Sequence, residues 1–511
     1  MAAWQPKPFI YEINTWVWLD SLSRTHHYNV ALNNVPEHVL DELGALNVDA
    51  VWLMGVWQHN PAGRTSALKY ADEYRSSLPD LTDDDIVGSP YAIGDYEVDD
   101  RLGGRAGLAA FRTQLGARGL KLILDFVPNH VATDHPWVSA YPHYFVRGNL
   151  RDLKTLPDTF FRTRDAWGRT LVVGHGRDPY FPGWIDTAQL DAFSPGYRQA
   201  ALETLLDIAA QCDGVRCDMA MLLVNKVFAS TWAGYVDEAP EDEFWETIIT
   251  QVKARFPHFL FAAEVYWGME ARLQQQGFDF TYDKLLYDRI VPGDVEKIRL
   301  HLLADIPFQK RSLRFIENHD EPRAAATLGE EIARPAAVLI STLPGAVLLH
   351  DGQLIGRRIK LPVQIRRQPE EPIDGSLLAY YRLLLAETRS SVYQTGEWQL
   401  LETHPAWGGN GTHEYLITYG WRNNGGESVT FRLIAINFTG EQAQAQVNLS
   451  SWPEIAEYNW CLHDVLNGDS FYHTADNLTR FGLYIDLPPY HAHIFAFDRV
   501  EGLLSNGTPG E

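Results

Sequence analysis

Cysteine is scarce in this chain of 511 residues, which contains only Cys212, Cys217 and Cys461. An odd number of cysteines at these spacings matches no disulfide framework and no metal-binding motif. Thiols that are neither paired nor bound to a metal are typical of a reducing compartment. The cysteine content therefore predicts reduced thiols and a cytoplasmic location.

Long apolar runs are also missing. No stretch approaches the roughly 18–20 apolar residues that a membrane-spanning helix needs. The first residues, MAAWQPKPFIYEINTW, do not combine a basic region with a following apolar segment, so we expect no signal peptide. Both absences favour a protein that works without a membrane partner.

Basic residues are outnumbered by acidic ones. The chain has 43 Lys and Arg against 66 Asp and Glu, for a net charge of −23. A nucleic-acid partner is therefore not expected, because its phosphates require a basic surface. The charge does not exclude an uncharged ligand. The aromatic content of 12% suits stacking on such a ligand, although most aromatic side chains are expected in the core.

Eight short β-rich runs alternate with helical patterns up to about residue 390. Several runs are almost continuously apolar, which is typical of parallel strands covered on both faces. The first run is expected to extend to Leu19 and the seventh to Asp320. The runs begin at Phe9, Asp49, Lys121, Gly214, Phe259, Phe278, Leu313 and Ala346. This alternation predicts an α/β fold, the (β/α)8 TIM barrel.

The helical patterns between the runs carry their own start signals. In SPGYRQAALETLLDIAAQC, Ser194 is the expected N-cap and Pro195 stands at the first helical position. Four further helices are expected in PEHVLDELGAL, GLAAFRTQLGARG, EFWETIITQVKARF and GSLLAYYRLLLAE.

One connection is much longer than an ordinary loop. About sixty residues rich in Pro, Gly and aromatics separate the third strand from the helix at Ser194, which predicts an inserted subdomain. After about residue 392 the pattern changes to β-like runs with turn signals, which predicts an all-β C-terminal sandwich domain. The expected division is 1–130 for the first part of the barrel, 131–190 for the subdomain, 191–392 for the rest of the barrel, 393–500 for the C-terminal domain and 501–511 for a tail.

Charged and polar side chains gather where four of the expected strands end. The active sites of (β/α)8 barrels lie at this end of the strands. The motifs DFVPNH, GVRCD, AEVYW and ENHD supply Asp125, Asn129, His130, Arg216, Asp218, Glu264, His319 and Asp320. A single polar strand end is ordinary, and either histidine alone would be interpreted as structural. Carboxylates from several strands repel one another at a shared rim unless a site uses them, so the set predicts an active site.

These four motifs, in this order, resemble the signature regions of the α-amylase family of glycoside hydrolases, glycoside hydrolase family 13. The resemblance extends over the whole chain. SPYAIGDY lies between the second and third strands, and QLD at Gln189–Asp191 resembles a fifth region. The family fold also has an inserted domain after the third strand and a C-terminal β-sandwich.

The resemblance implies roles for three carboxylates. Asp218 matches the nucleophile that forms a covalent glycosyl-enzyme, and Glu264 matches the general acid and base. Asp320 matches a third carboxylate that holds sugar hydroxyls. Retaining hydrolysis needs the nucleophile and the acid about 5–5.5 Å apart. Arg216, two residues before Asp218 and therefore on the same strand face, is expected to keep Asp218 ionised.

The resemblance also implies a set of substrate-binding residues. Tyr91 matches a tyrosine that stacks on the sugar whose bond is cleaved. His130 and His319 match histidines that hydrogen-bond the hydroxyls of this sugar. Asp125 and Arg216 are expected in the same substrate-binding set.

The chain departs from the family pattern just after the matched nucleophile. Many α-amylases carry Lys-His three and four residues later, where the His helps to hold calcium, but this chain has Met221 and Leu222. Asn129 matches another calcium-associated position or caps its strand end, so a calcium site near Asn129 stays open. The sequence favours a site without calcium, and no other cofactor is implied.

A basic segment, GQLIGRRIKLPVQIRR, follows the eighth strand of this acidic chain. We expect it to be a solvated loop, with contact to an anionic or phosphorylated substrate as the alternative.

The expected function is retaining hydrolysis of α-glucosidic bonds in an α-1,4-glucan or malto-oligosaccharide. A transglycosylase, either 4-α-glucanotransferase-like or disaccharide-forming, would use the same intermediate, and the sequence does not define the acceptor. The alternative from another class is a catalytically inactive, carbohydrate-binding barrel. That alternative predicts the loss of a carboxylate, whereas all three are present. Linkage, chain-length preference and oligomeric state stay open.

Overall fold

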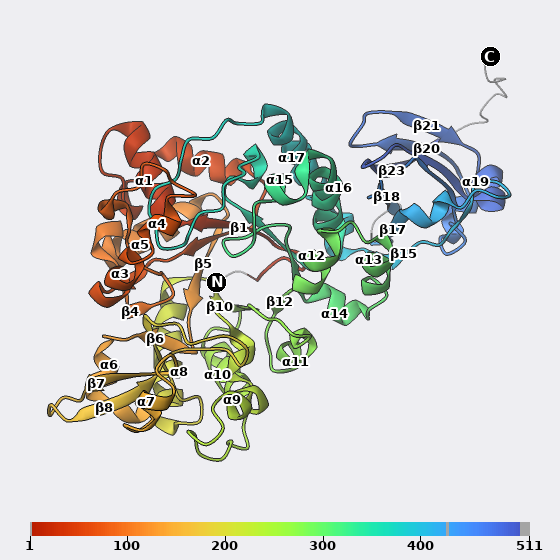
Figure 1. Cartoon of the computed structure of the whole chain (residues 1–511). Coiled ribbons are helices and arrows are strands. Elements are labelled where there is room, and N and C mark those ends of the chain that lie inside the picture. The colour runs from red at the N-terminus through yellow and green to blue at the C-terminus, as the bar shows by residue number, and fades with distance from the viewer. Residues whose placement is uncertain (1–2, 426–428, 501–511) are drawn as a thin grey trace.

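The computed structural model describes residues 3–425 and 429–500 of the chain. Figure 1 shows a central barrel, a lobe that projects from it and a β-rich domain at the blue end of the chain. The lobe contains α6 Pro136–Ala140, α7 Asp152–Thr155, β7 Phe160–Arg164 and β8 Thr170–Gly174. The expected tail, 501–511, lies outside the described residues.

Eight parallel strands close the central barrel, which confirms the predicted (β/α)8 fold. Each strand pairs in parallel with both of its neighbours. In barrel order the strands are β1 Phe9–Asn14, β14 Ala346–His350, β13 Ser312–Arg314, β12 Phe280–Tyr282, β11 Leu260–Ala263, β10 Gly214–Cys217, β5 Lys121–Phe126 and β2 Ala50–Met54.

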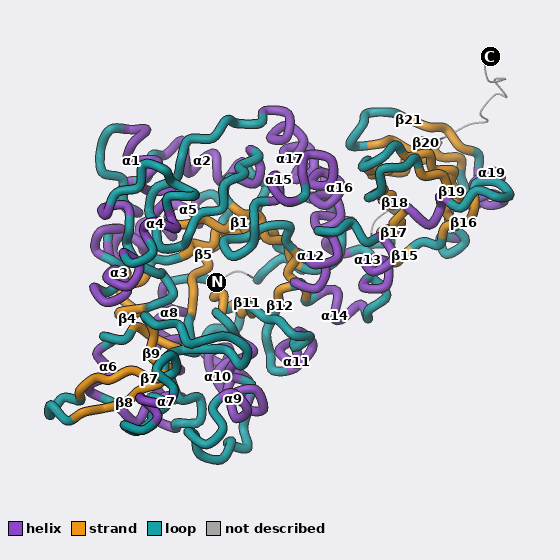
Figure 2. The backbone as a smooth tube through the Cα atoms, viewed as in Figure 1, coloured by secondary structure: helices purple, strands orange, loops and turns teal. Residues whose placement is uncertain are grey.

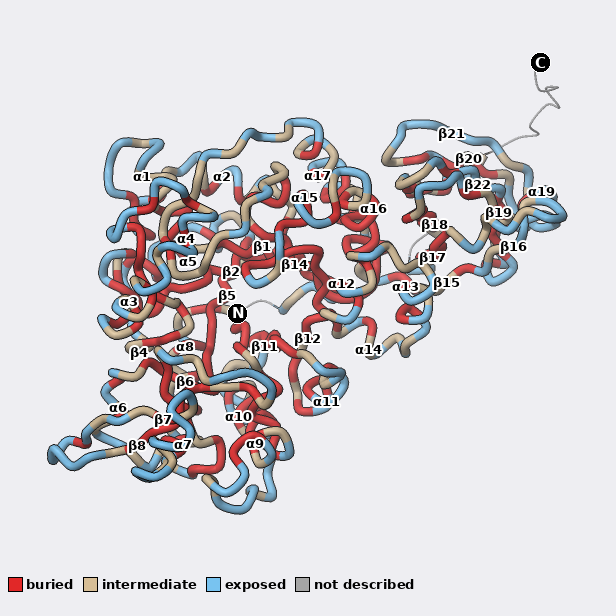
Figure 3. The backbone as a smooth tube through the Cα atoms, in the orientation of Figure 1, coloured by how far each residue is buried: buried red, intermediate tan, exposed pale blue. Residues whose placement is uncertain are grey.

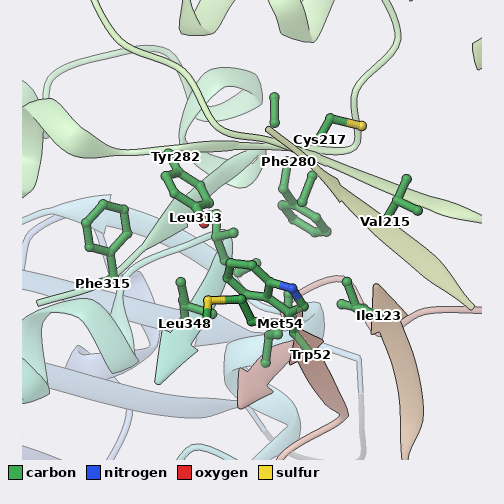
Figure 4. Close-up of a cluster of buried hydrophobic side chains, with 14 of the residues drawn as sticks. Trp52, Met54, Ile123, Val215, Cys217, Phe280, Tyr282, Leu313, Phe315 and Leu348 are labelled. Carbon is green, nitrogen blue, oxygen red and sulfur yellow. The ribbon is translucent and has the colours of Figure 1, made fainter. Parts of the chain in front are cut away.

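Apolar side chains fill the barrel and cover its outer face. Trp52, Ile123, Phe280 and Leu348 are buried in one cluster, which Figure 4 shows. Along β2 every residue is buried, because helices cover the strand face that does not point into the barrel. Figure 3 shows the same pattern as continuous red in the barrel strands. This two-sided burial explains why the strands read as unbroken apolar runs.

Two of the expected strands are shorter than their apolar runs. β1 ends at Asn14, and α1, Thr15–His26, follows at once because the Asn14 side chain accepts a hydrogen bond from the backbone N–H of Val17 at 3.3 Å. The expectation that this strand reaches Leu19 is therefore wrong. β13 ends at Arg314, so ENHD lies in the loop after the strand rather than in it.

The five expected helices are all present. Ser194 caps α8 by accepting a hydrogen bond at 3.4 Å from the backbone N–H of Tyr197, and Pro195 is the first helical residue. The helices are α2 Glu37–Ala45, α5 Gly104–Ala117, α8 Pro195–Gln211, α10 Phe244–Arg255 and α17 Gly375–Glu387.

Further helices complete the barrel. They are α9 Asn225–Thr231, α11 Glu270–Gln275, α12 Lys284–Ile290, α13 Val295–His301, α14 Ile306–Lys310, α15 Ala324–Thr327, α16 Gly329–Thr342 and α18 Ser391–Thr395. Within residues 3–425 and 429–500, no helix has both the length and the apolar character needed to cross a membrane. The three cysteines, Cys212, Cys217 and Cys461, are free thiols.

Two excursions leave the C-terminal rim of the barrel, and Figure 2 shows how much of each is loop. The excursion after β2 contains β3 Trp57–His59, α3 Pro61–Leu68, α4 Ala71–Tyr74 and β4 Ile93–Val98. The excursion after β5 contains β6 His130–Ala132, α6 Pro136–Ala140, α7 Asp152–Thr155, β7 Phe160–Arg164, β8 Thr170–Gly174 and β9 Thr187–Gln189. Because β6 pairs with β9, this inserted subdomain leaves and re-enters the barrel at one place.

The C-terminal domain consists of two antiparallel sheets around a common core. One sheet has the order β15-β17-β18-β23-β20-β21 and the other β16-β19-β22. Phe431, Ala445, Ile485 and Phe495 from the two sheets share a buried cluster. The elements are β15 Glu397–Leu400, β16 Thr403–Pro405, β17 Leu416–Asn423, β18 Thr430–Asn437, β19 Ala443–Val447, β20 Asn459–Asp464, β21 Ser470–His473, α19 Ala475–Phe481, β22 Leu483–Leu487 and β23 Ala492–Val500.

Candidate active site

Neighbouring barrel strands bring the charged groups together at one rim. Asp125 in β5 and Arg216 in β10 are partners in the strand register. Asp218 directly follows β10, and Glu264 directly follows β11. Parallel strands present their C-terminal ends on the same side of the barrel, so these side chains meet although they are distant in the sequence.

The guanidinium of Arg216 is the centre of the charge cluster. Its Nη1 lies 2.7 Å from Oδ1 of Asp218 and 3.6 Å from Oδ1 of Asp125. Its Nη2 lies 2.9 Å from Oε2 of Glu264 and 3.8 Å from Oδ2 of Asp320. Arg216 is only 1% exposed, so water screens these ion pairs little. One cation thus holds four carboxylates in a single cluster.

Both carboxylate oxygens of Glu264 have donors. The backbone N–H of Met219 donates to Oε2 at 2.6 Å, and the hydroxyl of Tyr266 donates to Oε1 at 2.8 Å. Met219 adopts a left-handed backbone conformation with φ of 43°, which turns the chain sharply after Asp218. This turn aims the N–H at Glu264 and fixes the Glu264 side chain, which contacts Arg216 as Asp218 does.

The protonation of Asp218 differs from the prediction. Arg216 lies beside it, as expected, but burial and the carboxylate of Glu264 raise the pKa of Asp218 to about 8. Burial and the repulsion between the two carboxylates therefore favour the protonated form of Asp218 in the free protein. Because both oxygens of Glu264 accept hydrogen bonds, the geometry favours Asp218 as the protonated partner in the free protein.

His319 and Asp320 belong to a second polar network, in the loop after β13. Nδ1 of His319 lies 2.5 Å from Oε1 of Glu12, and its Nε2 lies 3.0 Å from Oδ2 of Asp320 and 2.7 Å from the hydroxyl of Tyr91. Burial alone would lower the pKa of His319, but Asp320 and Glu12 raise it to about 10. Burial likewise opposes the ionisation of Asp320, yet His319 and Arg216 hold the pKa of Asp320 well below its usual range.

Glu12 is a site residue that the sequence reasoning missed. It lies in the apolar run of β1 and is completely buried. A carboxylate in the middle of a buried strand requires a charged or hydrogen-bonding partner, and this was the signal in the sequence. Through its contact with Nδ1, Glu12 fixes the orientation of the His319 ring.

A cavity of about 330 Å³ lies over the carboxylate cluster. Five of the predicted site residues line it, namely Tyr91, His130, Asp218, Glu264 and Asp320. The other three predicted residues, Asp125, Arg216 and His319, are buried and do not line this cavity. Arg216 and His319 contact residues that line the cavity, and Asp125 lies 3.6 Å from Arg216. This arrangement suits the orientation of the lining carboxylates.

The inserted subdomain supplies part of the cavity wall. Trp184, Asp186 and Thr187 line it, and the Trp184 ring lies 5.0 Å from that of His130. Burial lowers the pKa of His130 to about 3, so its imidazole is neutral near pH 7. The sequence predicted the subdomain but no individual residue of it for the cavity, because nothing in the local pattern shows which side chains face the barrel.

The basic segment after β14 is not the solvated loop that we expected. Ile365 is completely buried, and most of the segment is at least half-buried. Gln364 lines the cavity. The ammonium of Lys360 donates to the backbone carbonyl of Asp320. The prediction of a solvated loop was wrong because the partners of this polar, charged segment lie far away in the sequence.

Asn129 takes part in a network of side-chain amides. Its Oδ1 accepts a hydrogen bond from Nε2 of Gln189 at 2.9 Å, and its backbone carbonyl accepts from the same group at 2.8 Å. These bonds join QLD to the end of DFVPNH. Within the described part of the chain, no three His, Cys, Asp or Glu side chains are grouped so that they could hold a metal ion.

Comparisons of the sequence point to one family. The family model for the α-amylase catalytic domain matches residues 31–162. α-Amylase MalA of Haloarcula japonica is 30% identical over 329 residues, which are 62% of this chain and 40% of that protein. The α-1,4-glucan:maltose-1-phosphate maltosyltransferase of Rhodospirillum rubrum is 26% identical over 66% of this chain and 44% of its own length. The chain thus spans less than half the length of these two relatives.

Solved structures share the fold over nearly the whole chain. The maltogenic α-amylase AmyB of Thermotoga neapolitana superposes with a TM-score of 0.67 and 19% identity, covering 96% of this chain and 99% of that one. The α-amylase of Geobacillus thermoleovorans, solved with acarbose, gives a TM-score of 0.66 at 18% identity, with 98% and 100% covered. At these identities the likeness establishes the fold.

Proposed function

Because the chain belongs to the α-amylase family of glycoside hydrolases, we propose that it cleaves α-glucosidic bonds of an α-1,4-glucan or malto-oligosaccharide with retention of configuration. The observation that carries the proposal is the convergence of Asp218, Glu264 and Asp320 on one cavity around the buried Arg216.

In the first step of the proposed reaction, the Asp218 carboxylate attacks the anomeric carbon. Glu264 donates its proton to the glycosidic oxygen as the bond breaks, which leaves a covalent glycosyl-enzyme. In the second step Glu264 removes a proton from water, and the oxygen of this water displaces Asp218 from the anomeric carbon. Asp320 holds the sugar hydroxyls, with its position fixed by His319.

These steps require Asp218 to be ionised and Glu264 to carry a proton when the substrate is bound. A glycosidic oxygen that approaches Glu264 offers it a hydrogen-bond acceptor, which favours the protonated form. Arg216 contacts both carboxylates, so it stabilises the Asp218 anion.

A panel of starch, the maltose series, isomaltose, sucrose and trehalose tests the proposal. We expect hydrolysis of the α-1,4-linked members, with the new reducing end formed first as the α-anomer in ¹H NMR spectra. Initial formation of the β-anomer would contradict retention. No turnover of any α-glucoside would contradict the enzymatic function and favour a binding barrel.

Transfer to a sugar acceptor is the second candidate. Two observations favour it: one of the relatives is by name a maltosyltransferase, and the exposed rings of Tyr180 and Trp267, 5.0 Å apart, offer stacking surfaces to an acceptor. Incubation with maltotriose separates the two reactions. Longer oligosaccharides indicate transfer, whereas glucose and maltose alone indicate hydrolysis.

A further inference from the structure

The loop after β14 crosses the rim of the barrel and docks on the excursion after β2. In barrel order β1 lies between β14 and β2, so the crossing segment, residues 359–367, spans the end of β1; we call this segment the strap. The backbone carbonyl of Gln364 accepts a hydrogen bond from Val87 N–H at 2.9 Å. Ile365 forms an antiparallel bridge with Ile86, and Arg366 N–H donates to the Asp85 carbonyl at 2.9 Å.

An arginine clamp fastens the end of the strap. Nε and Nη2 of Arg367 donate to the two carboxylate oxygens of Asp85 at 2.8 and 2.9 Å. Nη1 donates to Asp80 at 2.8 Å. Two parallel bonds between a guanidinium and a carboxylate fix orientation as well as distance. The side chains of Arg367 and Asp85 are only 12% and 5% exposed, so the clamp is not a loose surface pair.

Apolar packing holds the middle of the strap. Ile365 is buried in a separate small core with Tyr74, Leu78, Leu81 and Ile86, all from the excursion after β2. Opening the strap would expose this cluster to water at a cost that scales with the apolar area. The strap is therefore a fixed wall and not a mobile lid.

One side of the strap borders the site. Gln364 lines the cavity together with Tyr91 and Asp320, and Lys360 donates to the Asp320 carbonyl. The leaving group of a cleaved bond must lie near its proton donor, Glu264. Asp320 and Tyr91, by the proposed roles, hold the sugar on the other side of that bond. Through Lys360 and Gln364 the strap lies on this side of the bond, where a longer substrate would continue.

We infer that the strap closes the cavity beyond a single terminal glucosyl unit, so the enzyme removes residues from the non-reducing ends of short α-glucosides. This inference rests on the proposed function and deepens it. The cavity volume of about 330 Å³ is at the small end of ligand sites, which suits a chain end better than the interior of a polymer. On the opposite side Tyr266 lines the cavity and the neighbouring Trp267 is exposed, so we expect the departing chain to leave there.

Two forms of one substrate test this inference. Maltoheptaose labelled at the reducing end is compared with the same compound blocked at its non-reducing end by a 4,6-O-benzylidene group, and an aryl α-glucoside reports basal activity. We expect labelled maltohexaose as the first product of the free form, and no cleavage of the blocked form. Equal cleavage of both at internal bonds would overturn the inference and leave the proposed function standing. Failure on all three substrates would overturn both.

Clamp variants give a second, independent measurement. In Arg367→Ala the released strap should allow cleavage of the blocked substrate. The ratio of blocked-form to free-form cleavage should rise at least about tenfold above the detection limit that applies to the parent protein. Asp85→Asn, which keeps the volume of its side chain, should act in the same direction and replaces Arg367→Ala if that variant does not fold. Arg105→Ala is the matched control, because Arg105 makes a two-bond ion pair with Asp207 between outer helices. An unchanged ratio in a folded clamp variant would contradict the role of the strap.

Discussion

At the scale of single residues, the carboxylates of this site depend on one another through Arg216. Asp218 and Glu264 lie 2.7 and 2.9 Å from its two terminal nitrogens, so removal of one carboxylate changes the charge around the other. Mutational effects in such a cluster are not additive. Substitutions that preserve side-chain volume therefore give the clearest tests.

Asp218→Asn should lower kcat by roughly four orders of magnitude or more while leaving the fold intact. The amide fills the same space but cannot attack the anomeric carbon. It also removes one of two mutually repelling buried acids, so the melting temperature should not fall. Steady-state kinetics and circular dichroism measure both effects. Near-normal turnover would exclude Asp218 as the nucleophile.

Glu264→Gln should lose activity on maltotriose but keep the first chemical step on substrates with activated leaving groups. A leaving group such as 2,4-dinitrophenolate needs no proton, so glycosylation proceeds without a general acid. A burst of released phenolate in rapid-mixing experiments would be the expected observation. An equal loss on both kinds of substrate would count against the acid role.

The raised pKa of Asp218 predicts an alkaline limit of activity. Burial and Glu264 raise the pKa of Asp218 to about 8, so the pair keeps its proton below that pH and loses it above. Without this proton the leaving oxygen cannot be protonated. We expect kcat/KM for maltotriose to fall about tenfold per pH unit above pH 8, and a profile that stays flat to pH 10 would contradict the coupling.

At the scale of elements, a capped helix precedes the strand that carries Arg216. Ser194 caps α8, and Cys212 and Asp213 join this helix to β10. Ser194→Ala should lower the free energy of unfolding by about 1 kcal/mol, because a backbone N–H loses its partner. Urea denaturation measures this difference. Ser194→Asp, which keeps an acceptor oxygen, is the control, and an equal loss in both variants would show that capping is not the cause.

Element boundaries show what the local sequence can define. The start of α8 can be predicted from Ser194, Pro195 and the helical period of the apolar residues, because capping and helix periodicity are local. β1 and β13 end earlier than their apolar runs because burial continues into α1 and into the loop that carries His319. An apolar residue reports burial, and only backbone pairing decides whether the buried segment is a strand.

At the scale of the whole molecule, the barrel and the C-terminal domain share a buried interface. The indole N–H of Trp421 in β17 donates to the carbonyl of Thr342 in α16 at 2.7 Å, and the hydroxyls of Tyr419 and Thr342 lie 2.6 Å apart. Arg432 donates to Glu387 at 2.6 Å across the same boundary. These contacts are buried or half-buried, so the two domains are expected to unfold together.

Trp421→Ala should destabilise the protein by about 3–5 kcal/mol, as for other large side chains removed from a core. The single thermal transition expected for the parent protein should then broaden or split, because the coupling between domains weakens. Differential scanning calorimetry distinguishes these outcomes. Trp421→Phe keeps most of the apolar contact and should show the smaller effect of losing one hydrogen bond. Two separate transitions in the parent protein would contradict the coupling.

The sequence by itself determined the barrel, its inserted subdomain and the C-terminal sheets, together with the carboxylates that gather at the rim. These features are local: apolar runs, helix caps and the polar groups after each strand can be recognised in a short segment, without knowing which other segments pack against it. The protonation of Asp218, the support of His319 by Glu12 and the docking of residues 359–367 were decided only by the tertiary structure. Each depends on burial and charge from chain segments far away, which a local pattern does not contain.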